Sequence, residues 1–395
     1  MSLCVRTKVF SGTTWIAPLG TLVSRRDKGS GLGTKGDRLE VIRKGTGGRS
    51  SFNGVIATVF GNSGTLGPPV VNELGKCGTM MILPYRGDFY RVAPMKICGD
   101  LGQVLFHSFF LKDEKSVAKA MQYSNVVINM IGKDTETSVF SFKDVHVDGA
   151  RMIARLARES GVEKLIHFSA LNAVENPKRK TVRASKFYAS KWEGEQAVRE
   201  EFPGAIVFRP ADIYGHKDRF IRYYGAFYRR YYNCICLWGN GKGVYKAPVF
   251  VSDVAQAVVK AVLQKGNEGE TYQAVGPKMY ELCELVDYIF RVMRRGPDTG
   301  YIRFDMRFDP LFLGRILFTQ MLLPKHPVLS FERLERENTS DELDKRYRLI
   351  SDLGIKLTEV EDRFPYELKA WRMHGYADPN MMQFERVRPA PGIPI

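Results

Sequence analysis

The stretch Gly54-Val-Ile-Ala-Thr-Val-Phe-Gly61-Asn-Ser-Gly64-Thr-Leu-Gly67 decides the fold of this 395-residue chain. Its first half is a short apolar run rich in β-branched residues, typical of a strand buried on both faces of a parallel sheet. Its second half is a glycine turn, and Pro68 and a helix-like segment ending at Gly75 follow it. Strand, glycine turn and helix in this order predict that backbone N–H groups and a helix N-terminus bind the pyrophosphate of a dinucleotide. We expect the cofactor to contact the turn residues, which are Gly61, Asn62, Ser63, Gly64, Thr65, Leu66 and Gly67.

The residue after the second predicted strand, which spans 79–85, indicates which dinucleotide binds. A site for NAD would place an acidic residue there to accept hydrogen bonds from the ribose hydroxyls. This chain has Arg86, whose guanidinium can bind a 2′-phosphate in bidentate geometry. The pattern therefore favours NADPH over NAD(H), with an ordinary surface arginine as the alternative.

Alternating strand and helix patterns continue along the chain and predict an α/β fold. Further strands are expected at 125–132 and 164–169, and helices at 116–123 and 148–160. This alternation predicts a Rossmann-type, doubly wound parallel sheet followed by a smaller mixed lobe and an extended tail. We place an NAD(P)-binding domain at 51–215, the smaller lobe at 216–305 and a C-terminal extension at 306–395.

The N-terminal segment has the composition of a mitochondrial targeting sequence. Residues 1–26 contain four Lys/Arg, seven Ser/Thr and no acidic residue. Gly/Ser/Thr-rich sequence from 28 to 52 reads as an extended connector. We assign residues 1–50 to targeting sequence and linker, and an uncleaved basic arm is the alternative.

Composition excludes several classes of protein. With 44% hydrophobic and 26% charged residues, the chain is neither disordered nor collagen-like. The formal net charge of +16 predicts acidic partners without identifying them. Six cysteines in so long a chain do not form a disulfide framework, and none has zinc-ligand spacing, so we expect no metal site; Cys234 and Cys236 fit alternate positions on a strand. No apolar run reaches the length of a membrane-spanning helix.

Four motifs, taken together, resemble the extended and atypical short-chain dehydrogenase/reductase (SDR) superfamily over residues 54 to about 300. They are the glycine turn, Lys191 on a later helix, and the segments Phe208-Arg-Pro-Ala-Asp-Ile-Tyr-Gly215 and Ala247-Pro-Val-Phe-Val-Ser-Asp-Val-Ala255. In this superfamily the lysine binds the nicotinamide ribose and the proline lies at the nicotinamide end. The resemblance implies further cofactor contacts at Leu111, Asn129, Ile131, Lys191 and Pro210.

Within that superfamily the chain is similar to the SDR-like accessory subunits of mitochondrial respiratory complex I (NADH:ubiquinone oxidoreductase). The similarity rests on residues 55–61, 99–103, 125–132 and 210–220 and continues toward the C-terminus. It implies a non-catalytic subunit that holds NADPH tightly, supports assembly and stability, and contacts other complex I subunits. It also implies a peripheral position on the matrix side of the inner membrane, near the junction of the peripheral and membrane arms.

Catalysis in the superfamily requires a Tyr-x-x-x-Lys pair, because the lysine lowers the pKa of the tyrosine that exchanges a proton with substrate. Four residues before Lys191 stands Phe187, which has no exchangeable proton, and Tyr188 is offset by about 100° around the helix. Ser169 lies near the usual strand-end hydroxyl. We predict no catalytic residue; the alternative is an active mitochondrial NADPH-dependent reductase or nucleotide-sugar epimerase.

The second half of the chain carries two surface patterns. Aromatic residues interleave with arginines at 220–232, which predicts a helix that buries its rings and exposes Arg222, Arg229 and Arg230. An RNA-binding surface is the alternative, but no RNA-binding signature accompanies it, and we expect no nucleic-acid partner. The apolar stretch 310–323 would be covered by a partner subunit, by anionic phospholipid headgroups at a membrane surface, or by the core. A charged helix is expected at 339–352.

Overall fold

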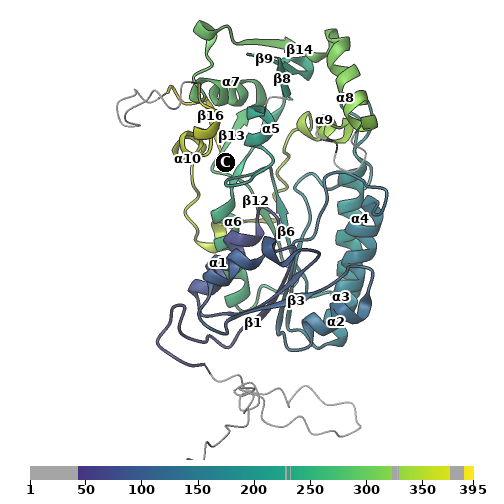
Figure 1. The fold of residues 1–395 in the computed structure, drawn as a ribbon, viewed down its shortest axis with the longest axis vertical. Coiled ribbons are helices and arrows are strands. Elements are labelled where there is room, and N and C mark those ends of the chain that lie inside the picture. The colour runs from purple at the N-terminus through teal and green to yellow at the C-terminus, as the bar shows by residue number, and fades with distance from the viewer. Residues whose placement is uncertain (1–42, 227–228, 232, 323–326, 328, 374–386) are drawn as a thin grey trace, which may run out of the picture.

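The computed structural model describes residues 43–226, 229–231, 233–322, 327, 329–373 and 387–395 (Figure 1). Within these residues the main sheet has eight parallel strands in the order β15-β12-β6-β5-β4-β1-β2-β3. Their bounds are β1 (Ile56–Phe60), β2 (Met80–Tyr85), β3 (Val104–Ser108), β4 (Val126–Asn129), β5 (Lys164–Phe168), β6 (Ile206–Pro210), β12 (Thr271–Ala274) and β15 (Arg348–Leu349).

Strand order reverses between β1 and β4. The chain runs outward from β1 to β2 and β3 and then returns to place β4 on the other side of β1. A crevice forms at the carboxyl ends of the strands where the order reverses, and ligands of open α/β sheets bind there. The predicted Rossmann-type doubly wound sheet is therefore confirmed, and its switch point lies at the glycine turn.

Helices cover both faces of the main sheet (Figure 1). α1 (Gly67–Lys76) packs against α6 (Val251–Leu263) on one face, and α2 (Glu114–Met121), α3 (Gly149–Glu159) and α4 (Lys186–Glu201) pack on the other. Both faces of strands such as β4 are consequently buried. This explains why these strands read as continuous apolar runs rather than as alternating ones.

The smaller lobe occupies the upper half of Figure 1 and is built from short strands and helices. Its sheets are β7–β11, β10–β13–β16 and β8–β9–β14. The strands are β7 (Ile213–Tyr214), β8 (Arg230–Tyr231), β9 (Cys234–Leu237), β10 (Tyr245–Lys246), β11 (Val249–Phe250), β13 (Lys278–Glu281), β14 (Ile302–Asp305) and β16 (Gly392–Pro394). The helices are α5 (Ile221–Gly225), α7 (Leu282–Val292), α8 (Pro310–Leu322), α9 (Phe331–Glu337) and α10 (Val360–Glu367).

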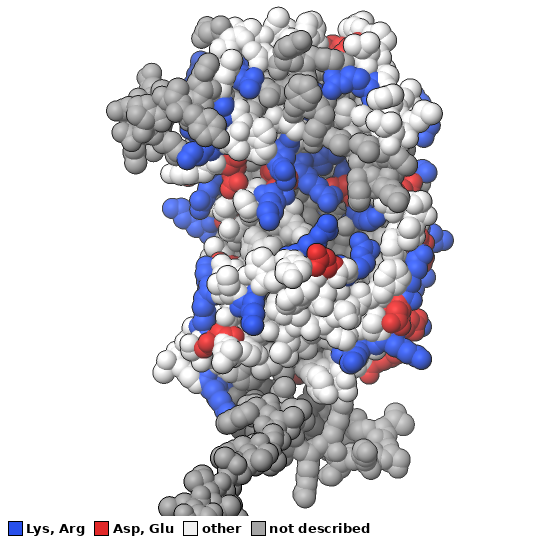
Figure 2. All heavy atoms as spheres, in the orientation of Figure 1, with Lys and Arg blue, Asp and Glu red and all other residues white. Residues whose placement is uncertain are grey.

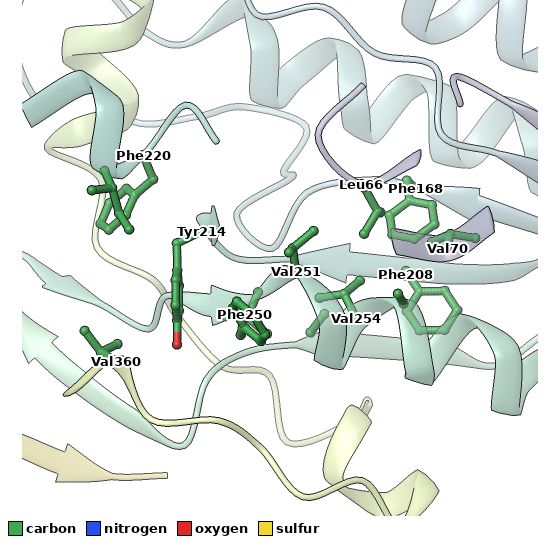
Figure 3. Close-up of a cluster of buried hydrophobic side chains, with 14 of the residues drawn as sticks. Leu66, Val70, Phe168, Phe208, Tyr214, Phe220, Phe250, Val251, Val254 and Val360 are labelled. Atoms are coloured by element: carbon green, nitrogen blue, oxygen red, sulfur yellow. The ribbon is translucent and has the colours of Figure 1, made fainter. Parts of the chain in front are cut away.

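One hydrophobic core continues from the main sheet into the smaller lobe. Figure 3 shows a part of it in which Leu66 and Phe168 of the sheet domain and Tyr214 and Val360 of the lobe belong to the same buried cluster. Because both lobes share this core, the elements that border the crevice are held in fixed positions.

Two predictions for the second half are wrong. The helix α5 ends at Gly225, and Arg229 beyond it is fully buried rather than exposed. The predicted helix at 339–352 is extended chain that contains the two-residue strand β15, followed by a short 3₁₀ turn over Ile350–Leu353. Pairing with the edge of β12 gives this segment backbone partners that its charge pattern does not reveal.

The predicted targeting sequence lies outside the described residues, except for its last few positions. There, Lys44 forms an isolated antiparallel bridge with Phe52, and Arg49 donates to Asn72 Oδ1 at 2.8 Å. The described end of the predicted connector is therefore attached to α1. None of the described helices combines the length and apolar character needed to span a bilayer.

Candidate dinucleotide site

The glycine turn is shaped by close backbone contacts. Gly61 has φ +80°, and a Cβ there would lie 2.8 Å from the carbonyl carbon of Met130. A Cβ on Gly67 would lie 1.8 Å from the carbonyl oxygen of Asn62. Gly64 closes the turn by donating its N–H to the carbonyl of Gly61 at 3.2 Å. Side chains are thus excluded where a phosphate must approach the backbone.

The N-terminus of α1 faces this turn without a competing acid. Pro68 and Pro69 occupy the first helical positions, and the first turn contains no acidic residue. Because proline has no N–H, an anion there would meet the backbone N–H groups ahead of Pro68 and the positive end of the helix dipole.

Other turn residues play different parts. The buried Asn62 side chain donates to the carbonyl of Pro84 at 2.7 Å and braces the turn against β2. Thr65 donates to the carbonyl of Lys217 at 3.2 Å, which connects the turn to the smaller lobe. Leu66 belongs to the core, and Ser63 lines a cavity described below.

A cavity of about 290 Å³ lies at the switch point, between the main sheet and the smaller lobe. It brings together six of the residues predicted to bind cofactor, which are Gly61, Gly64, Thr65, Leu66, Lys191 and Pro210. The hydroxyl of Ser169 also lines it and is buried without a hydrogen-bond partner among the described residues.

Seven predicted cofactor residues lie outside this lining: three belong to the glycine turn (Asn62, Ser63 and Gly67) and four lie elsewhere. Asn129 is buried, and its Oδ1 accepts from the backbone of Ile131 at 3.1 Å, so it orders the chain after β4. Leu111 packs in the core beneath α3, and Ile131 packs against that core. Arg86 is exposed, with its guanidinium carbon 5.5 Å from the ring centroid of Phe140.

Three basic side chains lie around Phe140, and none of them forms a salt bridge with a carboxylate of the described residues. Lys112 and Lys133 place their Nζ atoms 4.9 and 5.7 Å from the same ring centroid as Arg86. Their only side-chain hydrogen bonds among described residues go to Val139 O and Thr137 Oγ1. Burial, and secondarily Arg86, lowers the pKa of Lys133. This cluster is suited to bind an anionic group near the end of β2.

Lys191 lies at the base of the cavity and is almost fully buried. Its Nζ donates to the carbonyl of Phe168 at 2.9 Å. Burial lowers its pKa to about 8, although the Asp134 carboxylate opposes this shift. The position suits a hydrogen bond to a ribose hydroxyl.

Phe187 occupies the position one helical turn before Lys191, and its ring lines the cavity. The guanidinium of Arg336 stacks on it at 4.4 Å, and His146 packs edge-on at 5.3 Å. Tyr188 lines the same cavity, but burial raises its pKa above the ordinary value, so its phenol stays protonated.

His146 and His167, which lie near the cavity, are both buried. His146 bonds Ser190 Oγ at 2.8 Å and accepts from the backbone of Lys133 at 3.1 Å. Burial lowers the pKa of His146 to about 2 and that of His167 to about 3. Both rings are therefore neutral at physiological pH, and neither acts as a base there.

Charged residues that the sequence did not single out form the opposite wall. Arg219, Arg333 and Arg336 surround Asp134, which pairs with Arg219 and, at 3.3 Å, with Arg336. Burial opposes ionisation of Asp134, but the three arginines outweigh it and hold the pKa of its carboxyl well below the usual range. Arg333 and Arg336 come from α9, more than 260 residues after the glycine turn.

A second buried network closes the cavity from the lobe side. Lys246 contacts Asp212 at 3.3 Å and Asp341 at 3.8 Å. Burial opposes its charge, yet the two carboxylates hold the pKa of Lys246 above its usual value. Asp212 belongs to the Phe208–Gly215 motif, whereas nothing near Asp341 in the sequence indicated a role.

Fold and site together define an SDR-like protein that has a Rossmann-type sheet and a cavity at the switch point of that sheet. Residues 57–275 match the NAD dependent epimerase/dehydratase family. A solved UDP-glucose 4-epimerase from Thermotoga maritima superimposes with a TM-score of 0.55 at 16% identity, covering 80% of this chain and 97% of that one. This likeness shows the shared fold.

Curated relatives narrow the identification. The chain is 38% identical over 354 residues to NADH dehydrogenase [ubiquinone] 1 alpha subcomplex subunit 9 of Mus musculus, covering 89% of this chain and 88% of the relative. It is 32% identical to the NADH-ubiquinone oxidoreductase 40 kDa subunit of Neurospora crassa, covering 85% of each. The chain therefore belongs to the NAD dependent epimerase/dehydratase family and, within it, to the family of these mitochondrial alpha subcomplex 9 subunits.

Proposed function

We propose that this chain is an accessory subunit of mitochondrial respiratory complex I that binds NADPH as a structural cofactor and does not catalyse a reaction. The single observation that carries this proposal is a cavity at the glycine turn that has phenylalanine, not tyrosine, one helical turn before Lys191. Gly61, Gly64 and Lys191 line one cavity with Phe187, where the superfamily's chemistry needs a tyrosine. A cofactor bound there would lack the tyrosine that supplies the proton in the superfamily's reaction, and Tyr188 lies one position away from that place.

The residues present fit a dinucleotide. A Cβ would fill the cradle at Gly61 and Gly67, and Ser169 offers an unpaired buried hydroxyl in the same cavity. Gly64 and Thr65 would hold the pyrophosphate, Lys191 the nicotinamide ribose, and Pro210 the nicotinamide face. NADPH would supply hydride if a substrate and a proton donor were present. A ligand held at 100 times its Kd stabilises the native state by about 2.7 kcal/mol.

Arg86 and the two neighbouring lysines support NADPH over NAD(H). Three cations within 6 Å of the Phe140 ring centroid repel one another unless an anion is bound among them. A 2′-phosphate supplies that anion, and the ribose hydroxyl of NADH does not. Arg86→Glu is expected to weaken NADPH binding strongly and NADH binding little, measured by fluorescence titration of both.

The helix α8 supports docking to a neighbouring subunit. Phe312 and Ile316 are buried, whereas Leu317, Phe318 and Met321 have 59%, 63% and 87% of their surface exposed. An apolar face of this extent on a monomer is a contact surface for another protein. We assign it to a complex I subunit, and anionic phospholipid headgroups are the second candidate because Arg307 precedes the helix and Arg315 lies within it.

We further propose a peripheral position on the matrix side of the inner membrane, near the junction of the two arms, and a role in assembly and stability. Membership in the family of alpha subcomplex subunits and a basic, acid-free N-terminus support this location. An apolar contact helix on the lobe that borders the cofactor cavity supports a role for the cofactor in assembly.

The experiment that tests the proposal has two parts. Native-gel separation of mitochondrial membranes followed by mass spectrometry is expected to place the chain in the largest respiratory band. Purified chain is expected to carry NADPH and to leave carbonyl substrates and nucleotide sugars unchanged. Turnover that disappears in Tyr188→Phe would instead support the reductase or epimerase alternative, for which Tyr188 in the cavity is the one favourable observation.

A further inference from the structure

The second cavity of the molecule lies between the glycine turn and α9, and it is strongly basic. Its volume is about 500 Å³, and Ser63, Gly64 and Thr65 form one side. The lining includes five Lys/Arg, against Asp134 and Asp218 as the acidic residues. Figure 2 shows Lys and Arg side chains gathered across the middle of this face, around a hollow between the two lobes.

The guanidinium groups of Arg333 and Arg336 on α9 are only partly paired by the described residues. Nε and Nη2 of Arg336 are buried and have no hydrogen-bond partner among the described residues. Arg333 donates to the carbonyl of Arg219 at 2.8 Å, and no described carboxylate lies within salt-bridge distance of it. Buried guanidinium groups without full pairing carry a desolvation cost, which an anion in the cavity removes.

A continuous buried network connects α9 to α8. The guanidinium of Arg333 stacks on Tyr223 at 4.9 Å, and Tyr223 donates to Glu337 at 3.3 Å. Glu337 pairs with Arg229 at 3.0 Å, and the Arg229 guanidinium stacks on Phe312 of α8 at 4.8 Å. All of these side chains lie between the basic cavity and the inner face of α8.

We propose that α9 is a latch for the cofactor: the pyrophosphate held by the glycine turn is bound from its other side by Arg333 and Arg336, and this contact fixes the position of α8. The inference rests on the proposed NADPH site and deepens it. A pyrophosphate carries two negative charges, and the cavity has the matching surplus of positive charge on α9. Loss of cofactor leaves Asp134 as the carboxylate shared by these arginines, which neutralises them incompletely, and loosens α9 together with the apolar face of α8.

Hydrogen–deuterium exchange of the full 395-residue chain, with and without saturating NADPH, tests the latch. NADPH is expected to slow exchange in peptides covering 310–322 and 331–337. Arg333→Gln is expected to weaken NADPH binding about 10- to 100-fold, the loss of one charge-assisted contact, and to abolish the protection of α8. Arg346→Gln is the matched control, because that side chain is 83% exposed and pairs only with Asp344.

The outcomes separate the latch from the cofactor site. If wild-type chain binds NADPH but α8 exchanges equally fast with and without it, the latch is wrong and the NADPH site stands. If wild-type chain binds no NADPH, both proposals fail. Inorganic pyrophosphate is the second probe: protection of α9 in wild type but not in Arg333→Gln supports pyrophosphate recognition. Binding of pyrophosphate more tightly than NADPH would make this a site for free phosphate and overturn the latch.

Discussion

Replacing Arg229 by Met measures how strongly a buried ion pair holds α9 to the smaller lobe. The side chains of Arg229 and Glu337 are 0% and 2% exposed, and their nitrogen and oxygen atoms are 3.0 Å apart. Without Arg229, Glu337 keeps only the hydroxyl of Tyr223 as a side-chain donor. Leaving one charge of a buried pair without its partner costs about 3–5 kcal/mol. We therefore expect Arg229→Met to lower the free energy of unfolding by about this amount.

The double replacement Arg229→Met/Glu337→Leu separates the pair from packing. Nε and Nη1 of Arg229 have no hydrogen-bond partner among the described residues, so the native pair is itself incompletely compensated. Replacing both charges with apolar side chains is therefore expected to cost much less than Arg229→Met alone.

Urea unfolding followed by tryptophan fluorescence gives the free energies, and thermal unfolding gives a second measure. At about 2.1 cal/mol/K of unfolding entropy per residue, a loss of 3–5 kcal/mol in a chain of 395 residues lowers Tm by about 4–6 °C. The reasoning is refuted if Arg229→Met costs less than about 1 kcal/mol, a surface-like value, or if the double variant costs as much as the sum of the single ones.

Three further outcomes follow from the site and the lobe. Gly67→Ala is expected to destabilise the fold by about 1–3 kcal/mol because its Cβ would meet the backbone of Asn62. Gly64→Ala is expected to be tolerated, because its Cβ would meet only the carbonyl oxygen of Gly61 at 3.4 Å. Urea unfolding compares the two variants. The pKa of Lys191 is about 8 in the folded state and 10.5 in the unfolded state, so the unfolded chain binds more protons between these values. The free energy of unfolding of the cofactor-free chain is therefore expected to rise between pH 8 and 10.5. Subtracting the pH profile of Lys191→Met isolates the contribution of Lys191. Phe318→Glu is expected to leave the free energy of unfolding within about 0.5 kcal/mol of the wild-type value. It is expected to reduce incorporation of the chain into the largest respiratory band on native gels.

The sequence predicted features that local chemistry determines. Short apolar runs gave the parallel strands, and the glycine turn marked the crevice because only glycine fits where a Cβ would strike backbone. The helix predicted at 148–160 is observed as α3, Gly149–Glu159, because its apolar positions recur with helical spacing within one segment. Periodicity and turn chemistry act over a few residues, and these elements depend on little else.

Features that depend on distant contacts could not be predicted. Arg229 sits in a basic, aromatic segment that favours exposure, and only Glu337, 108 residues later, explains its burial. Asn62 occupies the glycine turn, but whether its side chain faces a ligand or braces β2 depends on the carbonyl of Pro84. Arg333 and Arg336 carry no motif at all, and they reach the cavity because α9 folds back over it.

The helix α9 lies in contact with Phe187, the residue that stands where the superfamily has its catalytic tyrosine. Arg336 stacks on Phe187 at 4.4 Å and pairs with Asp134, so a guanidinium lies beside the position where the superfamily's chemistry needs a tyrosine. A phenol at position 187 would meet this cation rather than open space, and the buried Tyr188 stays protonated beside it. On the proposed function, the loss of catalysis would involve more than one substitution, because Arg336 of α9 also lines the cavity beside Phe187. Such a site would keep the glycine turn and Lys191 for the cofactor, while the cation beside Phe187 takes space that a substrate would need.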